Sequence, residues 1–265
     1  KIIKRVLGGT VDYINSLENS TIKKIKKLKI KKYREEEQLF IAEGRKFLDF
    51  PFEPEIIIFR ESYEITEEIQ LKLKKFQCRK IVVSEKVFTQ LTSQENSQGV
   101  IIIYPYIKGA LENLQKNVVV LDKIGDPGNL GTIIRVADAA GFKDILLTKG
   151  SVDCYNEKVV RSSMGSIFNM NIIYMEEEEL IALLKKEEYK IVVTALEKNS
   201  VSYTQMKLAE KNAIVFGSEG DGVSQNFLKV CDEKIIIPIY GIAESLNVAM
   251  ASGIILYKTK EILGE

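Results

Sequence analysis

Short runs of consecutive apolar residues recur through the second half of the chain, and mixed segments long enough for a helix separate them. The apolar runs are 117–122, 144–149, 171–175, 190–196, 212–218 and 234–241. The segments expected to be helical are 129–140, 156–168, 176–188, 203–210, 222–231 and 244–262. Continuous apolar strands that alternate with helices are typical of a parallel sheet covered on both faces, so residues 117–265 predict an α/β domain. Ligands of such sheets bind in the loops at the carboxyl ends of the strands.

The first part of the chain predicts a second, smaller α/β unit over residues 20–105. Strands are expected at 39–44, 55–60, 79–85 and 99–105, and helices at 64–76 and 85–92. Residues 20–32 place three apolar side chains three apart among lysines (Ile22, Ile25 and Leu28), which predicts an amphipathic helix with a cationic outer face. Residues 106–116 are expected to be a linker and residues 1–19 an N-terminal extension.

The composition excludes several kinds of site. The 265 residues include no histidine, which removes Ser-His-Asp triads, Cys-His dyads and histidine–metal sites. Cys78, Cys154 and Cys231 are odd in number and lie far apart, so reduced thiols in the cytoplasm are expected and a metal site is not. No apolar run reaches 18 residues without a charge, so no membrane span is expected. The first residues show no secretory signal.

Charge is distributed unevenly along a chain whose formal net charge is +1. Residues 1–34 hold eleven Lys or Arg against two acids, a local basic surface that attracts polyanions such as RNA. The alternative is a solvated lysine-rich face without a partner. The candidates for contact with RNA are Lys24, Lys27, Lys31, Lys32, Arg34 and Arg45.

Three loops that follow predicted strands carry candidate chemistry. In the first, residues 121–142, Arg135 is available to a substrate, or else it pairs with Asp138 on the surface. In the second, Ser218 and Asp221 have the spacing of a helix-capping box, whereas Glu219 stands between two glycines and serves no cap. These glycine loops match neither the dinucleotide fingerprint nor the P-loop.

The third loop leads into a terminal helix, 244–262, for which Ser245 is the expected cap. The first turns of this helix are apolar on nearly every side, and small residues would let another backbone come close. We therefore expect the helix to lie partly in a subunit interface; the alternative is burial against the sheet alone.

Taken together and in this order, three segments closely resemble the three motifs of the SpoU (TrmH-like) RNA methyltransferases of the SPOUT superfamily. They are NLGTIIRVADAAG (129–141), IVFGSEGDGVS (214–224) and IPIYGIAESLNVAMASGI (237–254). In addition, IKKIKKLKIKKYREEEQLFIAEGRKFL (22–48) is similar to the start of the RNA-binding domain, with a ribosomal-protein-like α/β fold, that precedes the catalytic domain in many of these enzymes. The two resemblances account for nearly the whole chain.

The resemblance implies transfer of a methyl group from S-adenosylmethionine to a ribose 2′-hydroxyl of RNA. It also implies a deep trefoil knot in the C-terminal part of the sheet and an obligate homodimer, which periodicity alone does not indicate. The N-terminal domain favours ribosomal RNA, most often of the large subunit, over transfer RNA. A role in drug resistance through ribosomal RNA methylation stays open, and neither DNA nor a membrane is an expected partner.

The resemblance also carries over site residues by position. Asn129 and Arg135 match the first motif, Glu219 the second, and Ser245 and Asn247 the Ser-Leu-Asn of the third. These are the expected catalytic residues. The residues expected to bind the cofactor are Gly217, Ser218, Ile237, Gly241 and Leu246. One departure is the pair Ala243 and Glu244, where relatives often have smaller or uncharged residues, so the cofactor loop is expected to differ in detail.

An activated methyl donor suits a chain without histidine, because the enzyme then mainly positions an oxygen in line with the methyl carbon. Arg135 is a poor general base, since the pKa of a guanidinium exceeds about 12. We interpret it as an electrostatic stabiliser of the developing oxyanion and the adjacent phosphate, with phosphate and water as alternative proton acceptors.

Two rival functions make different demands on the sequence. A nucleotide-dependent oxidoreductase needs a glycine fingerprint after the first strand and an acid about 20 residues on, and neither is present. A non-catalytic RNA-binding protein of the same fold could lose Arg135, Glu219 or Asn247, and the chain keeps all three. The sequence therefore favours an active enzyme.

Overall fold

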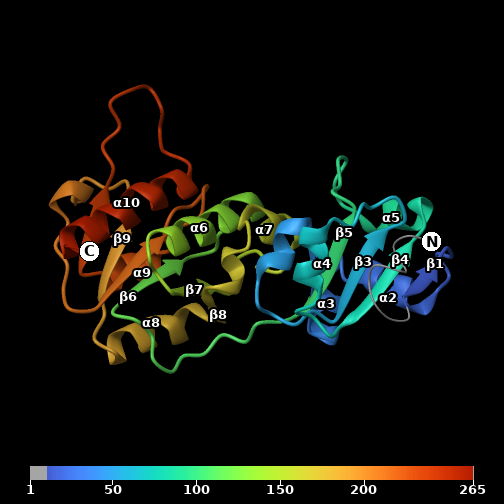
Figure 1. Cartoon of the computed structure of the whole chain (residues 1–265). Helices are drawn as coiled ribbons and strands as arrows, with labels where there is room; N and C mark the ends of the chain where they lie inside the picture. Colours follow the sequence, from blue (N-terminus) through green and yellow to red (C-terminus); the bar gives the residue numbers. More distant parts are fainter. Residues whose placement is uncertain (1–10, 265) are drawn as a thin grey trace. The chain divides into compact units, whose positions relative to one another are not determined.

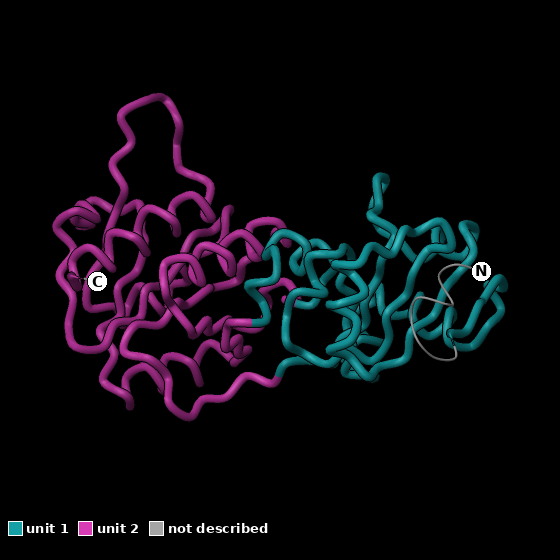
Figure 2. Tube along the Cα trace, viewed as in Figure 1, with its two compact units in different colours: residues 1–107, 155–168 teal, residues 108–154, 169–265 magenta. Residues whose placement is uncertain are grey.

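The structure is a computed structural model that describes residues 11–264, and these form two compact units (Figure 2). Unit 1 contains residues 11–107 together with the later segment 155–168, and unit 2 contains residues 108–154 and 169–264. None of the helices in the described part of the chain combines the length and apolar character that crossing a bilayer requires. Residues 1–10 of the expected N-terminal extension lie outside the described residues.

Unit 1 is built around a mixed five-stranded sheet in the order β1-β4-β3-β5-β2. Strands β1, β4 and β3 run parallel, and β5 pairs antiparallel with both β3 and β2. The side chains of Ile22, Ile25 and Leu28 are buried in its core, as their spacing predicts. The elements are β1 (Asp12–Ile14), α2 (Ser20–Lys27), α3 (Lys31–Glu37), β2 (Leu39–Glu43), η1 (Arg45–Asp49), β3 (Ile56–Arg60), α4 (Glu67–Leu73), β4 (Arg79–Val83), α5 (Glu85–Leu91), β5 (Val100–Pro105), α7 (Glu157–Ser162) and η2 (Ser166–Phe168) (Figure 1).

The single helix expected over residues 20–32 is wrong, because the chain breaks between α2 and α3. The last turn of α2 tightens through i→i+3 hydrogen bonds, such as that from the Leu28 N–H to the Ile25 carbonyl. Arg34, on α3, then reaches back and donates from Nη1 to the Leu28 carbonyl at 2.9 Å. The guanidinium thus satisfies a carbonyl at the end of α2 that the broken helix leaves without an intrahelical partner.

The segment 155–168 follows a strand of unit 2 in the sequence but packs in unit 1. Its last residue, Phe168, stacks on Phe50 with ring centroids 4.9 Å apart and meets the edge of Tyr104 at 4.8 Å. Phe40 stands 6.0 Å from the same ring. Aromatic pairs at these distances add to the burial of their surfaces. The helix expected over 156–168 is therefore divided into α7 and the short η2, which presents Phe168 to this cluster.

Unit 2 contains the parallel sheet that the alternating pattern predicts, with seven strands in place of the six expected. Its order is β10-β12-β9-β11-β6-β7-β8. Helices α8 and α9 bury apolar side chains on one face, among them Leu180, Leu184 and Phe227, and α6 packs against α10 (Figure 1). The elements are β6 (Asn117–Leu121), α6 (Pro127–Ala139), β7 (Asp144–Thr148), β8 (Asn171–Met175), α8 (Glu177–Lys186), β9 (Lys190–Thr194), β10 (Val201–Ser202), η3 (Tyr203–Gln205), β11 (Asn212–Phe216), α9 (Gln225–Val230), β12 (Glu233–Ile236) and α10 (Val248–Leu263).

The direction of the sheet reverses beside β6. From β6 the chain moves outward to β7 and β8, returns to β9 on the opposite side, and then places β11 between β9 and β6. In such sheets the loops after two strands at a reversal point diverge and leave a crevice for ligands. Here those loops follow β6 and β11, which carry the first and second of the three motifs.

Two local predictions for unit 2 are wrong. The helix expected over 203–210 is a single 3₁₀ turn, η3, and it follows a short strand, β10, that the pattern does not indicate. The terminal helix begins at Val248, capped by Asn247 and not by Ser245. The trefoil knot stays a prediction.

We predict that Phe168→Ala destabilises unit 1 by about 3–5 kcal/mol, because it removes a buried ring from the aromatic cluster and leaves a cavity. Urea unfolding followed by tyrosine fluorescence measures the change. Met164→Ala is the matched control, since this side chain lies on the same segment but is exposed and should change stability by less than about 0.5 kcal/mol. Equal effects of the two substitutions would contradict the packing role of Phe168.

Candidate active site

The second motif forms a tight arch, residues 217–223, between β11 and α9. Ser218 and Gly222 exchange two backbone hydrogen bonds, of 3.0 and 3.1 Å, which close its neck. A Cβ on Gly217 would lie 2.0 Å from the Gly222 carbonyl carbon, so no other residue fits at this crossing. Glu219 stands exposed at the tip. The expected capping box is wrong: the Ser218 hydroxyl does accept from the Asp221 N–H at 3.2 Å, but no helix begins there, and α9 starts at Gln225.

The first motif starts helix α6 with an Asp-Pro pair. The Asp126 carboxylate accepts from the Asn129 N–H at 2.8 Å, and Pro127 fills the first helical position, where the missing N–H does no harm. This cap fixes the backbone of Asn129 and leaves its side-chain amide free to point toward the arch. The Asp-Pro dipeptide is the signal that the sequence analysis did not use.

Three residues from the three motifs meet in one chain of hydrogen bonds. The Asn129 Nδ2 donates to Glu219 Oε1 at 2.5 Å, and the Asn247 Nδ2 donates to Asn129 Oδ1 at 2.9 Å. In the sequence, Glu219 lies 90 residues and Asn247 lies 118 residues from Asn129. The structure therefore joins the three motif loops within a single chain, with Glu219 paired to Asn129.

The third motif forms a projecting loop, residues 237–246, that stands away from the body of unit 2 before it enters α10 (Figure 1). Ile237 at its base is half-buried, whereas Gly241, Ser245 and Leu246 are exposed. A Cβ on Gly241 would meet no atom within 4 Å. Asn247 ends the loop and caps α10, accepting from the Ala249 and Met250 N–H groups at 3.0 and 3.3 Å. Among these residues, Asn247 is the one tied to the first motif.

Arg135 is exposed on α6 and has no hydrogen-bond or ion-pair partner within residues 11–264. Its alternative partner, Asp138, instead accepts from Asn169 Nδ2 at 2.6 Å. The surface pair Arg135–Asp138 is therefore not formed. Arg135 follows Asn129 by six residues, about 9 Å along the axis and on a different side of the helix, so its guanidinium is not part of the amide chain.

The two loops nearest the amide chain have a marked charge bias. Glu219, Asp221 and Glu244 are acidic, and neither 217–226 nor 235–247 contains Lys or Arg. Their glycine backbones are open, since a Cβ on Gly220, Gly222 or Gly241 would meet nothing within 4 Å. A ligand with a positive centre and no phosphate suits such surroundings, whereas a di- or triphosphate does not.

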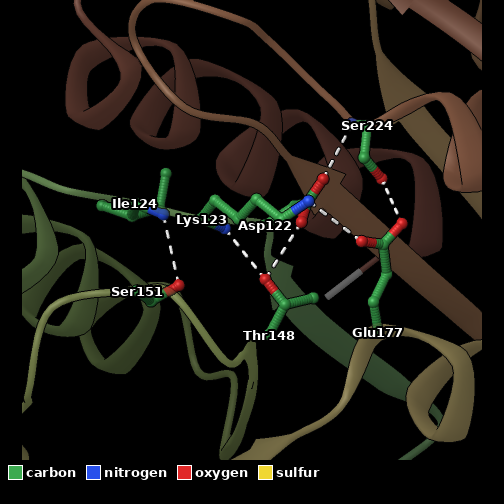
Figure 3. Close-up of polar contacts among 7 residues, drawn as sticks. All are labelled: Asp122, Lys123, Ile124, Thr148, Ser151, Glu177 and Ser224. Atoms are coloured by element: carbon green, nitrogen blue, oxygen red, sulfur yellow. Dashed lines mark hydrogen bonds and ion pairs between the residues drawn. The ribbon is translucent and has the colours of Figure 1, made fainter.

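Behind the arch lies a buried polar network that the sequence analysis did not identify (Figure 3). Asp122, at the end of β6, is 1 % exposed and accepts from the Thr148 hydroxyl at 3.0 Å and the Ser224 N–H at 2.8 Å. Glu177 accepts from the Ser224 hydroxyl at 2.6 Å and from Lys123 Nζ at 3.0 Å. Burial raises the pKa of Glu177, but these hydrogen bonds outweigh it and hold the pKa below its ordinary value.

The basic residues expected to contact RNA lie in unit 1, and one of them is buried. Arg34 is 3 % exposed and bonded to the Leu28 carbonyl, so the structure corrects its assignment from a surface contact to a structural one. Lys24, Lys31, Lys32 and Arg45 are exposed, the lysines in ion pairs with nearby glutamates. Lys27 is exposed beside the ring of Tyr33. Exposed pairs are weak and exchange readily, so the lysines remain accessible to a polyanion.

Two family models match the chain. Residues 116–257 match the SpoU rRNA Methylase family, and residues 19–102 match the MRM3-like substrate binding domain. The first match contains all three motif loops, and the second covers most of the five-stranded unit.

Individual relatives and solved structures agree with these matches. The 23S rRNA (guanosine(2553)-2′-O)-methyltransferase RlmP of Bacillus subtilis is 34 % identical over 92 % of this chain and 97 % of its own length. The tRNA (guanosine(18)-2′-O)-methyltransferase of Aquifex aeolicus is 32 % identical over 58 % of this chain and 74 % of its own. The AdoMet-bound rRNA methyltransferase of Sinorhizobium meliloti superposes with a TM-score of 0.86 at 31 % identity, covering 96 % of this chain and 99 % of that one.

We predict that Gly217→Ala opens the neck of the arch and lowers the stability of unit 2 by about 1–3 kcal/mol, because the methyl group has no room. Thermal unfolding measures the loss. Gly220→Ala, on the same arch, is the control, since its Cβ would meet nothing within 4 Å. The crossing would be disproved if the two variants unfolded at the same temperature.

Proposed function

This chain belongs to the SpoU rRNA Methylase family, and we propose that it methylates a ribose 2′-hydroxyl of large-subunit ribosomal RNA with S-adenosylmethionine as donor. The observation that carries the proposal is the hydrogen-bond chain from Asn247 through Asn129 to Glu219. It brings the three family motifs together at the reversal point of a parallel sheet, the position at which such sheets bind ligands.

Ribosomal RNA is favoured over transfer RNA as the substrate because a relative named for ribosomal RNA aligns with unit 1 as well as with unit 2. RlmP of Bacillus subtilis, named for 23S rRNA, aligns over 92 % of the chain, which includes unit 1. The Aquifex aeolicus enzyme named for tRNA aligns over 58 %, and the 23S rRNA enzyme RlmB of Escherichia coli over 54 %, so the match of RlmP across unit 1 is the feature that favours rRNA. Unit 1 also matches a substrate-binding family model. We propose that its exposed face of Lys24, Lys27, Lys31 and Lys32, with Arg45, contacts the RNA backbone, where such cations supply affinity without sequence preference.

The cofactor suits the residues that would hold it. S-adenosylmethionine supplies a methyl carbon already activated by a sulfonium cation. The acidic arch and projecting loop, free of Lys and Arg, tolerate that positive charge, and their open glycine backbones admit a ligand. We propose that Gly217, Ser218, Ile237, Gly241 and Leu246 bind the cofactor.

We propose that the catalytic group comprises Arg135, Asn129, Glu219, Ser245 and Asn247. Asn129 and Asn247 are held by helix caps and by each other, so they are fixed in place before the substrate arrives. Arg135, free among the described residues, would stabilise negative charge on the attacking oxygen and on the neighbouring phosphate. Its guanidinium keeps its proton, so the hydroxyl proton passes to phosphate or to water.

A homodimer through α10 would complete this arrangement. Met250, Ile254 and Tyr257 leave apolar surface exposed along one side of the helix, in addition to the side buried on α6. Gly253 on α10 packs next to Val136, which follows Arg135 on α6. We propose that pairing of the two copies covers the apolar side and brings Arg135 to the partner's amide chain. A cytoplasmic location is part of the same proposal, consistent with three free cysteines among the described residues.

Ribosomal and transfer RNA incubated with methyl-labelled S-adenosylmethionine should test the function. We expect label on ribose in 23S rRNA and little in tRNA, and nucleoside mapping identifies the site. Arg135→Ala should lower transfer more than about a hundredfold while calorimetry shows unchanged cofactor affinity. Label on a base, or transfer by Arg135→Ala within tenfold of the unmodified enzyme, would refute the assignment.

Ile254→Glu should convert the dimer into a 30.0 kDa monomer, because a charge at the centre of the apolar side cannot be buried unpaired. Light scattering after gel filtration measures the mass. Leu71→Glu is the control, an exposed leucine in unit 1 that lies outside this surface. Mixing Arg135→Ala with Asn247→Ala subunits should restore partial transfer, and a mixture as inactive as its components would argue against a shared site.

A further inference from the structure

The two ends of the arch meet at one residue. The Asp122 N–H donates to the carbonyl of Phe216, the last residue before the arch, at 2.8 Å. The Asp122 Oδ2 accepts from the N–H of Ser224, the first residue after the arch, also at 2.8 Å. The backbone of one buried residue therefore holds the entry of the arch while its side chain holds the exit. Figure 3 shows the bond at the exit, between Asp122 and Ser224.

The carboxylate that holds the exit is itself fixed. Its second oxygen accepts from the Thr148 hydroxyl at 3.0 Å, and that hydroxyl accepts from the Lys123 N–H at 2.9 Å. The Ser224 hydroxyl is turned away to Glu177, so Ser224 gives α9 no side-chain cap. A carboxylate that accepts from a backbone N–H at a helix N-terminus is favourably placed, because the dipole and the unpaired N–H groups attract it.

We infer that Asp122 is a positioning residue for methyl transfer, which sets the place of Glu219 opposite the capped Asn129. The inference rests on the proposed function and extends it to a buried residue behind the arch. Glu219 lies on an arch closed by the Ser218–Gly222 hydrogen bonds, so the arch moves as one body when its ends move. The two bonds to Asp122, from its N–H to the Phe216 carbonyl and from the Ser224 N–H to its carboxylate, then set the direction of the arch relative to α6.

Three variants separate this role from general stability. Asp122→Asn keeps the bond at the exit of the arch, since its Oδ1 can accept from the Ser224 N–H, while its Nδ2 donates to the Thr148 hydroxyl and so reverses that bond. Asp122→Ala loses both. Thr148→Val keeps both bonds to the ends of the arch and removes a buried hydroxyl from the same network, so it serves as the stability control.

We expect Asp122→Ala to lower kcat about a hundredfold, as misplacement of reacting groups by about 1 Å does. Asp122→Asn should stay within about threefold of the unmodified enzyme, because it retains the hydrogen bond from the Ser224 N–H that holds the exit of the arch. Thr148→Val should lower the melting temperature without that loss of kcat. If Asp122→Ala kept its kcat within threefold, or Asp122→Asn lost as much as Asp122→Ala, the inference would be overturned.

Amide hydrogen exchange on the cofactor-free protein gives a readout that does not depend on activity. In Asp122→Ala the amides of residues 217–224 should exchange faster while those of β7 keep their protection; in Thr148→Val the arch should stay protected. If Asp122→Ala fails to fold, hydrogen exchange in the unmodified protein still tests the inference. A Ser224 amide that exchanges as fast as the Gly220 amide would show that Asp122 does not hold the exit of the arch. Absence of any ribose methylation by the unmodified enzyme would defeat the proposed function and leave these exchange results standing.

Discussion

The parallel pairing of β6 with β11 is the constraint on which the site depends. The two strands are 95 residues apart in the sequence, and they pair in register from Asn117 opposite Asn212 to Leu121 opposite Phe216. Both are buried on both faces, so a slip by one residue would reverse the direction of every side chain in a packed core. The register therefore also fixes where Asp122 and Gly217 emerge, side by side at the carboxyl edge. Loop positions at this edge are consequences of strand register.

The strands themselves could be predicted from the sequence, but their order could not. Each run of Val and Ile is a local signal, and each of the six runs in the second half of the chain contains a strand in the structure, although the last run, 234–241, leaves its strand after Ile236. Which strand lies beside which depends on contacts between distant residues, about which periodicity is silent. The same limit explains residues 203–210, where a polar segment with helical spacing forms a single turn because it follows β10 at the edge of the sheet. It also explains why segment 155–168, read as an ordinary crossover helix, packs in the other unit.

The site residues that belong to a family motif could be predicted from the sequence. The polar residues that come from separate segments outside the motifs could not. Asn129, Glu219 and Asn247 came from the family motifs, and the structure joins them by hydrogen bonds. Asp122, Thr148, Glu177 and Ser224 come from four separate segments, and each alone is an ordinary polar residue near the end of a strand or the start of a helix. Arg34 was expected to contact RNA but is buried, because a count of charges along a basic run does not reveal which side chain turns inward.

The orientation of the amide chain follows from a helix cap. The Asn247 Oδ1 is committed to the first N–H groups of α10, so its Nδ2 is the group that faces Asn129. Asn129 must then present its oxygen to Asn247 and its Nδ2 to the arch, and the arch must offer an acceptor there. A carboxylate, which accepts and does not donate when ionised, meets that requirement whichever oxygen is presented. A glutamine in its place could turn its own donor toward Asn129, so the glutamate between two glycines makes the direction of the whole chain of hydrogen bonds unique.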